Sequence, residues 1–259
     1  LDACRLCTTG AAPTAPELLL FFLAIGIPVS EQWGMSETSC IATINRPDAI
    51  RIGTVGTPVP GVELRTASDG ELLVRGPLVT RGYRGRPDLT AAAFDDDGWF
   101  RTGDIARIDA DGYVRIVDRK KELMITSGGK NLAPSTIEAR LKAASPLIGQ
   151  VCSIGDGRPY VTALVVLDPD AVRAFGADAG LPGRRPEELV GEPLLLEAVA
   201  DAVSRANRRL ARVEQVKRWV VLPEEWMPDG DELTPTMKLK RRAITEKYAD
   251  RIAALYADR

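Results

Sequence analysis

Residues 98–134 read GWFRTGDIARIDADGYVRIVDRKKELMITSGGKNLAP, and the rest of the chain is organised around this stretch. It places the carboxylate of Asp104 just after a glycine, which predicts a tight turn before an acidic group. Residues 105–117 alternate and branch like two strands, split by the turn sequence of residues 109–112. Three cations at 119–121 and the glycine loop 127–130 follow. On residue types alone, this pattern is typical of a charged hairpin with a glycine loop.

The composition predicts a soluble globular protein of one or two domains. The chain has 259 residues, of which 45% are apolar and 27% charged. Its formal net charge of −2 provides no overall basic field that would attract nucleic acid. It contains no histidine, which excludes Ser-His-Asp and Cys-His catalysis and any histidine-ligated metal within the chain.

The four cysteines favour thiols over a metal site. Cys4 and Cys7 form a CxxC pair, whereas Cys40 and Cys152 are far apart in the sequence. A structural zinc site would need a second close pair. We therefore expect buried thiols in a reducing compartment.

The longest apolar run, residues 18–27, is too short to span a bilayer. We expect it to form a buried helix that begins at Pro16 and ends at Gly26. The sequence shows no signal peptide, and its start at Leu1-Asp2 predicts that the chain is a fragment of a longer protein.

Three further segments combine glycines, hydroxyls and charges in patterns suited to a nucleotide. Residues 9–13, TGAAP, have the small side chains that let a flat ligand approach the backbone. Residues 32–37, QWGMSE, offer an aromatic face for adenine, a hydroxyl for phosphate and a carboxylate for Mg²⁺. Residues 231–243, DELTPTMKLKRRA, place cations after a Thr/Pro loop. Taken singly, these segments also fit a strand-to-helix turn, a core tryptophan beside a solvated glutamate, and a solvated basic helix start.

Together, and in this order along nearly the whole chain, the motifs resemble the adenylate-forming superfamily of acyl-CoA synthetases, adenylation domains and luciferases. Residues 100–104 resemble its Tyr-Arg-Thr-Gly-Asp motif, and residues 32–37 its Tyr-Gly-x-Thr-Glu motif. Residues 9–13 resemble its Gly-Gly-Ala-Pro segment. Residues 118–121 resemble the motif that carries the hinge between its large and small domains. The forms DRKKELMITSGGKN and LTPTMKLKRR are closest to long-chain fatty acyl-CoA synthetases.

The resemblance implies a set of nucleotide-binding residues in the first half of the chain. Asp104 would accept the ribose hydroxyls, with Arg119 supporting the same sugar, and Glu37 would hold Mg²⁺. Two positions depart from the family pattern: Ala11 replaces the second glycine, and Trp33 replaces the tyrosine, which keeps stacking and loses the phenol hydroxyl. The implied nucleotide-binding set is Gly10, Ala11, Ala12, Trp33, Gly34, Ser36, Asp104 and Arg119.

The resemblance also implies roles for residues in the second half of the chain. Lys121 would be the hinge, and Gly128, Gly129 and Lys130 would form a loop on the coenzyme A side. Counting forward from Thr234, with Arg241 matched to the motif arginine, places the catalytic lysine at Lys238. Because Met237 replaces the usual glycine, Lys240 remains a competing candidate.

The implied fold is α/β with two parts. Residues 1–120 would form the C-terminal part of the large AMP-binding domain, with strands, a helix and a small β-barrel. Residues 121–259 would form the small, mobile α/β domain with about three strands and flanking helices. Within it, Ser135 to Glu138 predicts a capping box, and the polar segment 176–193 predicts an insertion.

The implied activity has two steps. A long-chain fatty acid would attack ATP to give acyl-adenylate and pyrophosphate, and coenzyme A, as co-substrate, would then displace AMP. The family's phosphate-binding loop and most of its acyl tunnel would lie outside this chain, so we expect the chain to be inactive alone. Two alternatives remain: a ligase for an aryl, amino or shorter acyl acid, and a non-catalytic module that keeps the fold. We expect a cytoplasmic protein without a nucleic acid partner; peripheral membrane association stays open, and the oligomeric state is not predicted.

Overall fold

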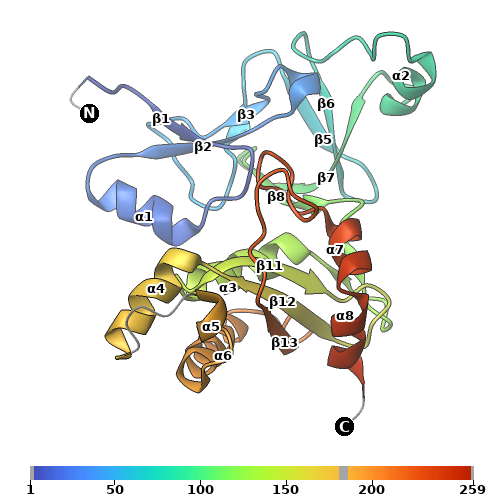
Figure 1. The fold of residues 1–259 in the computed structure, drawn as a ribbon. Helices are drawn as coiled ribbons and strands as arrows, with labels where there is room; N and C mark the ends of the chain where they lie inside the picture. Colours follow the sequence, from blue (N-terminus) through green and yellow to red (C-terminus); the bar gives the residue numbers. More distant parts are fainter. Residues whose placement is uncertain (1–2, 181–185, 258–259) are drawn as a thin grey trace. The chain divides into compact units, whose positions relative to one another are not determined.

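A computed structural model describes residues 3–180 and 186–257 and divides the chain into two compact units (Figure 1). The first unit is Leu1–Glu122 and the second is Leu123–Arg259.

The first unit begins with a four-stranded sheet. Its strands, in spatial order, are β1 (Cys7–Thr9), β2 (Val29–Trp33), β3 (Thr43–Ile44) and β4 (Thr57–Pro58). Strands β1 and β2 are parallel, and the connection between them contains helix α1 (Pro16–Ala24), because parallel neighbours need a crossover. The other pairs are antiparallel, and the 3-10 turn η1 (Ser36–Thr38) follows β2.

A second, antiparallel sheet completes the first unit. It consists of β5 (Glu63–Thr66), β6 (Glu71–Arg75), β7 (Phe100–Ile108) and β8 (Val114–Arg119), in that order, with helix α2 (Pro87–Ala93) preceding β7. The predicted pair of strands around the turn at residues 109–112 is confirmed. The tight turn expected before Asp104 is wrong, because Asp104 lies inside β7. Gly103 has φ +70° within that strand, and the register with β8 shifts between Ile105 and Ala106.

Helix α1 forms where predicted, with Pro16 at its first turn and Gly26 in the left-handed conformation just after it. Its expected burial is wrong, because Leu19 is its only buried residue. The helix PELLLFFLA is apolar on all sides, whereas β2 lies against only part of its surface. The apolar side chains left exposed on α1 and just after it are Leu18, Leu20, Phe21, Leu23 and Ile25.

The second unit is built on a three-stranded sheet, as predicted. Strand β12 (Val161–Leu167) lies between β11 (Ile148–Ile154), which is antiparallel to it, and β13 (Val216–Leu222), which is parallel to it. A short hairpin of β9 (Met124–Ile125) and β10 (Asn131–Leu132) precedes the sheet. The helices of this unit are α3 (Pro134–Ala144), α4 (Pro169–Asp178), α5 (Pro186–Leu189), α6 (Pro193–Asn207), α7 (Arg241–Lys247) and α8 (Ala249–Tyr256).

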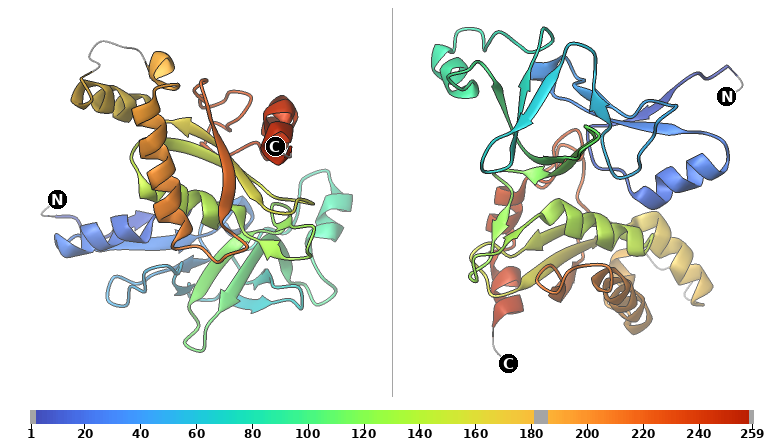
Figure 2. Two further views of the ribbon diagram at one scale, coloured as in Figure 1. Left: turned by 90° about the horizontal axis from the view of Figure 1, so that it is seen from below. Right: turned by 180° about the vertical axis from the view of Figure 1, so that it is seen from behind.

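Both faces of this sheet are covered, so every residue of β12 is buried. Val161, Ala163 and Val165 pack into one core cluster, whereas Leu164 and Val166 pack into another on the opposite face. Figure 2 shows α3 and α6 on the first face and α7 and α8 on the second. The sheet therefore fixes the position of the basic segment that precedes α7.

Three expectations for the second unit and the cysteines need correction. The capping box at Ser135 is wrong: α3 begins after Ala133 without a side-chain cap. Segment 176–193 is not loop throughout, because α4 and α5 reach into it and Leu189 is a core residue, while residues 181–185 lie outside the described residues. Burial is confirmed for the thiol of Cys152 and is wrong for Cys4 and Cys40, which are exposed. In the part of the chain that the structure describes, no helix has the length and apolar composition of a membrane span.

Candidate nucleotide and acid-activating site

The structure brings three of the predicted nucleotide residues together around one carboxylate. Asp104 on β7 and Arg119 on β8 are paired in register, and Arg119 Nε lies 2.7 Å from Asp104 Oδ1. Trp33, at the end of β2, donates its indole N–H to Asp104 Oδ2 over 2.8 Å. The Asp104 side chain is only 5% exposed, while that of Arg119 is 49% exposed. The two N–H donors stabilise a buried carboxylate that would be costly to hold without partners.

The segment predicted to line the adenine pocket follows β1. Gly10 packs against β2 so closely that a Cβ there would lie 3.1 Å from the carbonyl oxygen of Gln32. Ala11 has φ +69°, the left-handed conformation that favours glycine, and Ala12 beside it is exposed. The chain therefore keeps a glycine-like backbone at the position where its sequence departs from the family glycine.

Gly34 and Glu37 belong to the tight segment after β2. A Cβ at Gly34 would lie 2.5 Å from the carbonyl of Cys40, so this position needs glycine. Ser36 is exposed at the start of η1, and the carboxylate of Glu37 accepts a hydrogen bond of 2.9 Å from the hydroxyl of Tyr83. Burial and this hydrogen bond raise the pKa of Tyr83, so its hydroxyl stays protonated and donates to Glu37.

The two loop candidates near the boundary between the units are exposed. Lys121 lies in a turn closed by a hydrogen bond from the Glu122 amide to the Arg119 carbonyl. In the β9–β10 hairpin, Gly129 has φ +73°, and a side chain there would meet open space. Lys130 donates its amide to the hydroxyl of Thr126, which closes this loop.

The basic segment forms a compact loop just before α7. The amide of Lys238 donates to Thr234 Oγ1 over 3.0 Å, and the amide of Thr234 donates to the Lys238 carbonyl over 2.8 Å. Met237 has φ +62° in this loop. Lys238 is exposed, whereas the ammonium of Lys240 donates to the carbonyl oxygen of Gly230 over 2.9 Å.

The motif arginine anchors this loop to the core of the second unit. Arg241 forms a two-pronged pair with Glu138 on α3, with N–O distances of 2.7 and 2.6 Å. The same carboxylate accepts the amide and the hydroxyl of Ser153 on β11. Glu138 therefore holds the start of α7 against α3 and the sheet.

Comparisons with known proteins place this geometry in one family. A profile described as "AMP-binding enzyme" matches residues 1–84, and a profile described as "AMP-binding enzyme C-terminal domain" matches residues 121–259. The chain belongs to the AMP-binding enzyme family.

Similar AMP-binding enzymes include proteins named as fatty-acid–CoA ligases. The chain is 51% identical to fadD11 of Mycobacterium tuberculosis over 98% of its own length and 44% of that relative. It is 41% identical to the long-chain-fatty-acid–CoA ligase FadD15 of Mycobacterium bovis over 98% of the chain and 42% of the relative. A chicken long-chain-fatty-acid–CoA ligase, ACSBG2, is 34% identical over the whole chain and 37% of the relative. The chain thus spans less than half the length of these relatives.

Solved structures of AMP-binding enzymes share the fold. The adenylation domain of a carboxylic acid reductase from Segniliparus rugosus, in complex with AMP and a co-purified carboxylic acid, matches with a TM-score of 0.76 and 26% identity. That match covers 96% of this chain and 39% of the reductase chain. The ATP-bound RpMatB-BxBclM chimera B1 matches with a TM-score of 0.69 and 30% identity, over 95% of this chain and 46% of the other. The α/β fold predicted from the sequence is confirmed.

Two contacts of this AMP-binding enzyme were missed from the sequence. Tyr83, which holds Glu37, lies 46 residues further along the chain. Glu138 and Arg241, which anchor the lysine loop, lie 103 residues apart. Neither pair has a characteristic spacing in the sequence. Glu138 nevertheless lies on the buried face of α3, and a buried glutamate usually has a cationic partner, so its position was a signal that could have been used.

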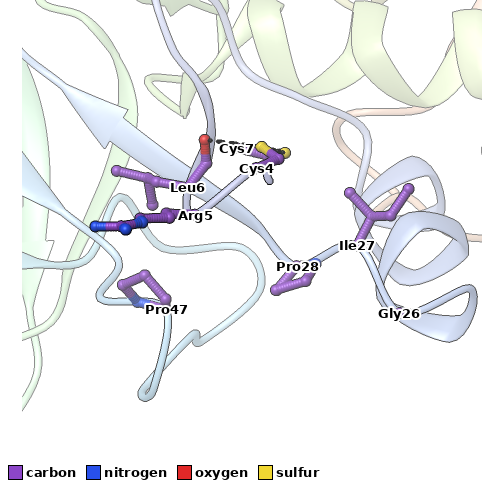
Figure 3. A pocket seen from close by; sticks show the side chains of 8 residues that line it. All are labelled: Cys4, Arg5, Leu6, Cys7, Gly26, Ile27, Pro28 and Pro47. Carbon is purple, nitrogen blue, oxygen red and sulfur yellow. Dashed lines mark hydrogen bonds between the residues drawn. The ribbon is translucent and has the colours of Figure 1, made fainter. Parts of the chain in front are cut away.

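The N-terminal hollow of this AMP-binding enzyme is separate from the predicted site residues. In it, the sulfurs of Cys4 and Cys7 lie 3.4 Å apart (Figure 3). The hydrogen bond with Cys4 raises the pKa of Cys7. No group of three or more potential metal-ligating side chains occurs among residues 3–180 and 186–257. The hollow is lined by Cys4, Arg5, Leu6, Cys7, Gly26, Ile27, Pro28 and Pro47.

Proposed function

We propose that this chain supplies the adenosine-binding face and the catalytic lysine loop of an ATP-dependent long-chain fatty-acid–CoA ligase. In this proposal, residues 1–120 are the end of the large domain and residues 121–259 are the mobile small domain. The ligase joins a fatty acid to AMP with release of pyrophosphate and then transfers the acyl group to coenzyme A. The names of the relatives, which match over nearly the whole chain, support this proposal.

The first unit binds the adenosine part of ATP. Asp104 accepts the ribose hydroxyls, because a carboxylate has about four acceptor positions, and Arg119 supports the same sugar. The backbone of Gly10, Ala11 and Ala12 lines the adenine. Trp33 and Gly34 complete the base side of the pocket, and the exposed hydroxyl of Ser36 donates to a phosphate oxygen. The buried pair of Asp104 and Arg119 supports this assignment.

Glu37 is the residue that would hold Mg²⁺ beside the phosphates. A single carboxylate fits the way Mg²⁺ usually binds, with one or two protein carboxylates, several waters and the substrate phosphates. The Tyr83 hydroxyl occupies one lone pair of Glu37 Oε1 and fixes the direction of the carboxylate. When bound, Mg²⁺ would supply positive charge to the departing pyrophosphate.

The observation that carries the assignment of the catalytic residue is the left-handed backbone of Met237, φ +62°, immediately before Lys238. This is the conformation that glycine favours, so Met237 occupies the position of the family glycine, and the lysine after it is Lys238. Lys238 is exposed, whereas Lys240 is occupied by the carbonyl of Gly230. The ammonium of Lys238 is therefore available to bridge the carboxylate and the α-phosphate as negative charge gathers there.

The remaining roles belong to the second step. Rotation about Lys121 exchanges the lysine loop for the hairpin loop. Gly128 and Gly129 then present backbone to the pantetheine, since neither has a Cβ, and Lys130 adds a positive charge beside them. The open space around Gly129 supports this role.

A chimera tests the function and the lysine together. The segment of FadD15 that matches this chain is replaced by the chain, and formation of long-chain acyl-CoA is measured. In this chimera, Lys238→Ala should slow pyrophosphate release by about 10²–10³-fold, the usual effect of removing one preorganised charge. It should leave the conversion of added acyl-adenylate to thioester nearly unchanged, and Lys240→Ala is the matched control. If Lys240→Ala alone abolishes pyrophosphate release, the catalytic lysine is two positions further on.

The same chimera separates the proposed activity from its alternatives. Assays with long-chain, short-chain, aryl and amino acids should give the highest rate with the long-chain acid if the chain contributes to the same chemistry as its relatives. A folded chimera that binds ATP and forms no adenylate with any acid would favour a non-catalytic module.

A further inference from the structure

We propose that Trp33 is a positioning residue for the ribose carboxylate: its indole N–H fixes the orientation of Asp104 and so sets how strongly the site distinguishes a ribose from a deoxyribose. This inference rests on the proposed nucleotide site. It assigns to Trp33 a function of its indole edge, in addition to the stacking expected of its face.

The two oxygens of the Asp104 carboxylate are held from different sides. Oδ1 is paired with Arg119 Nε at 2.7 Å, and Oδ2 accepts from Trp33 Nε1 at 2.8 Å. One donor therefore comes from β8, the direct neighbour of β7, and the other from β2 in a different sheet. Because both oxygens are held, rotation of the carboxylate plane would break at least one of these hydrogen bonds.

The donor from Trp33 is itself held firmly. Its ring packs against one apolar cluster around Val62 and Val74 and against another around Leu72 and Val114. Because the indole is fixed between two clusters, its N–H has a defined direction, unlike the guanidinium of Arg119, whose side chain is half exposed. If Arg119 were the only partner considered, the orientation of the Asp104 carboxylate would change whenever the Arg119 side chain moved.

Orientation matters because a ribose diol presents two hydroxyls at a fixed separation. A carboxylate that keeps one plane can accept both hydroxyls with good geometry, whereas a rotating carboxylate loses part of that interaction. Replacing Trp33 by phenylalanine keeps an aromatic face and removes the N–H. The loss should therefore be confined to ligands that carry the ribose hydroxyls.

The test compares binding of AMP and 2′,3′-dideoxy-AMP to the purified chain by calorimetry. We expect the unmodified chain to bind AMP more tightly than 2′,3′-dideoxy-AMP. Trp33→Phe should lower the affinity for AMP about tenfold and change the affinity for the dideoxy nucleotide by no more than about twofold. Trp226→Phe is the matched control, because it also removes an indole hydrogen bond, to the hydroxyl of Tyr248. That variant should leave the ratio of the two affinities unchanged.

A spectroscopic measurement on the unmodified chain provides an independent criterion. The Trp33 indole N–H cross-peak in a ¹⁵N spectrum, identified by its loss in Trp33→Phe, should move on addition of AMP and stay in place with 2′,3′-dideoxy-AMP. If Trp33→Phe fails to fold, the peak is assigned by elimination. The chain has four tryptophans, and the Trp33 peak is the one that remains in each of the variants Trp99→Phe, Trp219→Phe and Trp226→Phe.

Each outcome has a defined meaning. A stationary Trp33 cross-peak at saturating AMP overturns the inference, and so does an unchanged affinity ratio in folded Trp33→Phe; both leave the proposed nucleotide site intact. Equal affinity for both nucleotides in the unmodified chain contradicts the ribose role of Asp104 itself and removes the inference with it. If the isolated chain binds no AMP, the same comparison is made in the FadD15 chimera, where absence of AMP binding has that same meaning.

Discussion

Replacement of Ala11 or Met237 by glycine should stabilise the protein, although both changes remove side-chain atoms. The two residues have φ values of +69° and +62°. A non-glycine residue in this conformation costs the folded state about 1–2 kcal/mol, which glycine would relieve. Glycine also makes the unfolded chain more flexible, which offsets about 0.5–1 kcal/mol of that gain. Ala11 is exposed and Met237 is 47% exposed, so little burial is lost. We therefore expect each variant to raise the free energy of unfolding by about 0.5–1 kcal/mol.

The assay is urea denaturation followed by tryptophan fluorescence, with the neighbouring residue as control in each case. Ala12 and Thr236 are not among the described residues with positive φ, so Ala12→Gly and Thr236→Gly should lower the free energy of unfolding. The two stabilising changes lie in different units and should add in the double variant. If Ala11→Gly and Met237→Gly destabilise as much as their neighbours do, the left-handed backbone is not present, and the argument for Lys238 fails.

Three further predictions concern Glu31, Arg241 and Lys121. Burial raises the pKa of Glu31, so the folded state binds the proton more tightly, and the free energy of unfolding should fall as pH rises from the ordinary glutamate pKa through the raised one. Glu31→Gln should remove this slope and stabilise the protein at neutral pH. If urea denaturation gives parallel pH profiles for the variant and the unmodified chain from pH 4 to 8, the prediction is wrong. Arg241→Ala leaves the buried Glu138 carboxylate without its cation and should lower the free energy of unfolding by about 3 kcal/mol, whereas Arg242→Ala, at an exposed pair, should have no measurable effect. In the FadD15 chimera, Lys121→Pro fixes φ at the proposed hinge and should spare one half-reaction while the other collapses; equal loss of both steps would argue against a hinge.

The elements with strong local signals could be predicted from the sequence. Strands β7 and β8 follow from alternation around a turn of aspartates and glycine, and the nearly continuous apolar run of β12 is explained by two covered faces. Proline at the first turn marks α1 and α3, because it lacks the N–H that a first turn leaves unpaired. These signals depend on residues close together in the chain.

Features that depend on distant partners could not be predicted. The capping box at Ser135 had the right spacing, but α3 begins at Pro134, so Ser135 lies inside the helix, and the Glu138 carboxylate is held in a two-pronged ion pair with Arg241. Likewise, the apolar sequence of α1 indicates a surface that ought to be covered, and says nothing about which element covers it. The indole of Trp33 offers both a face and an N–H, and only the position of Asp104 shows that the N–H is used.

Two of the departures from the family motifs replace a glycine, and at both of them the backbone keeps the conformation that glycine favours. A sequence comparison counts Ala11 and Met237 as mismatches to glycine, and the second mismatch left the catalytic lysine undecided between two positions. The left-handed φ at both residues shows that these loops retain the path that glycine would favour. That path places Lys238, rather than Lys240, directly after the left-handed residue, with its ammonium exposed and its backbone tied to Thr234. The backbone conformation of Met237 therefore supports Lys238 as the proposed catalytic lysine, which the residue types alone left open.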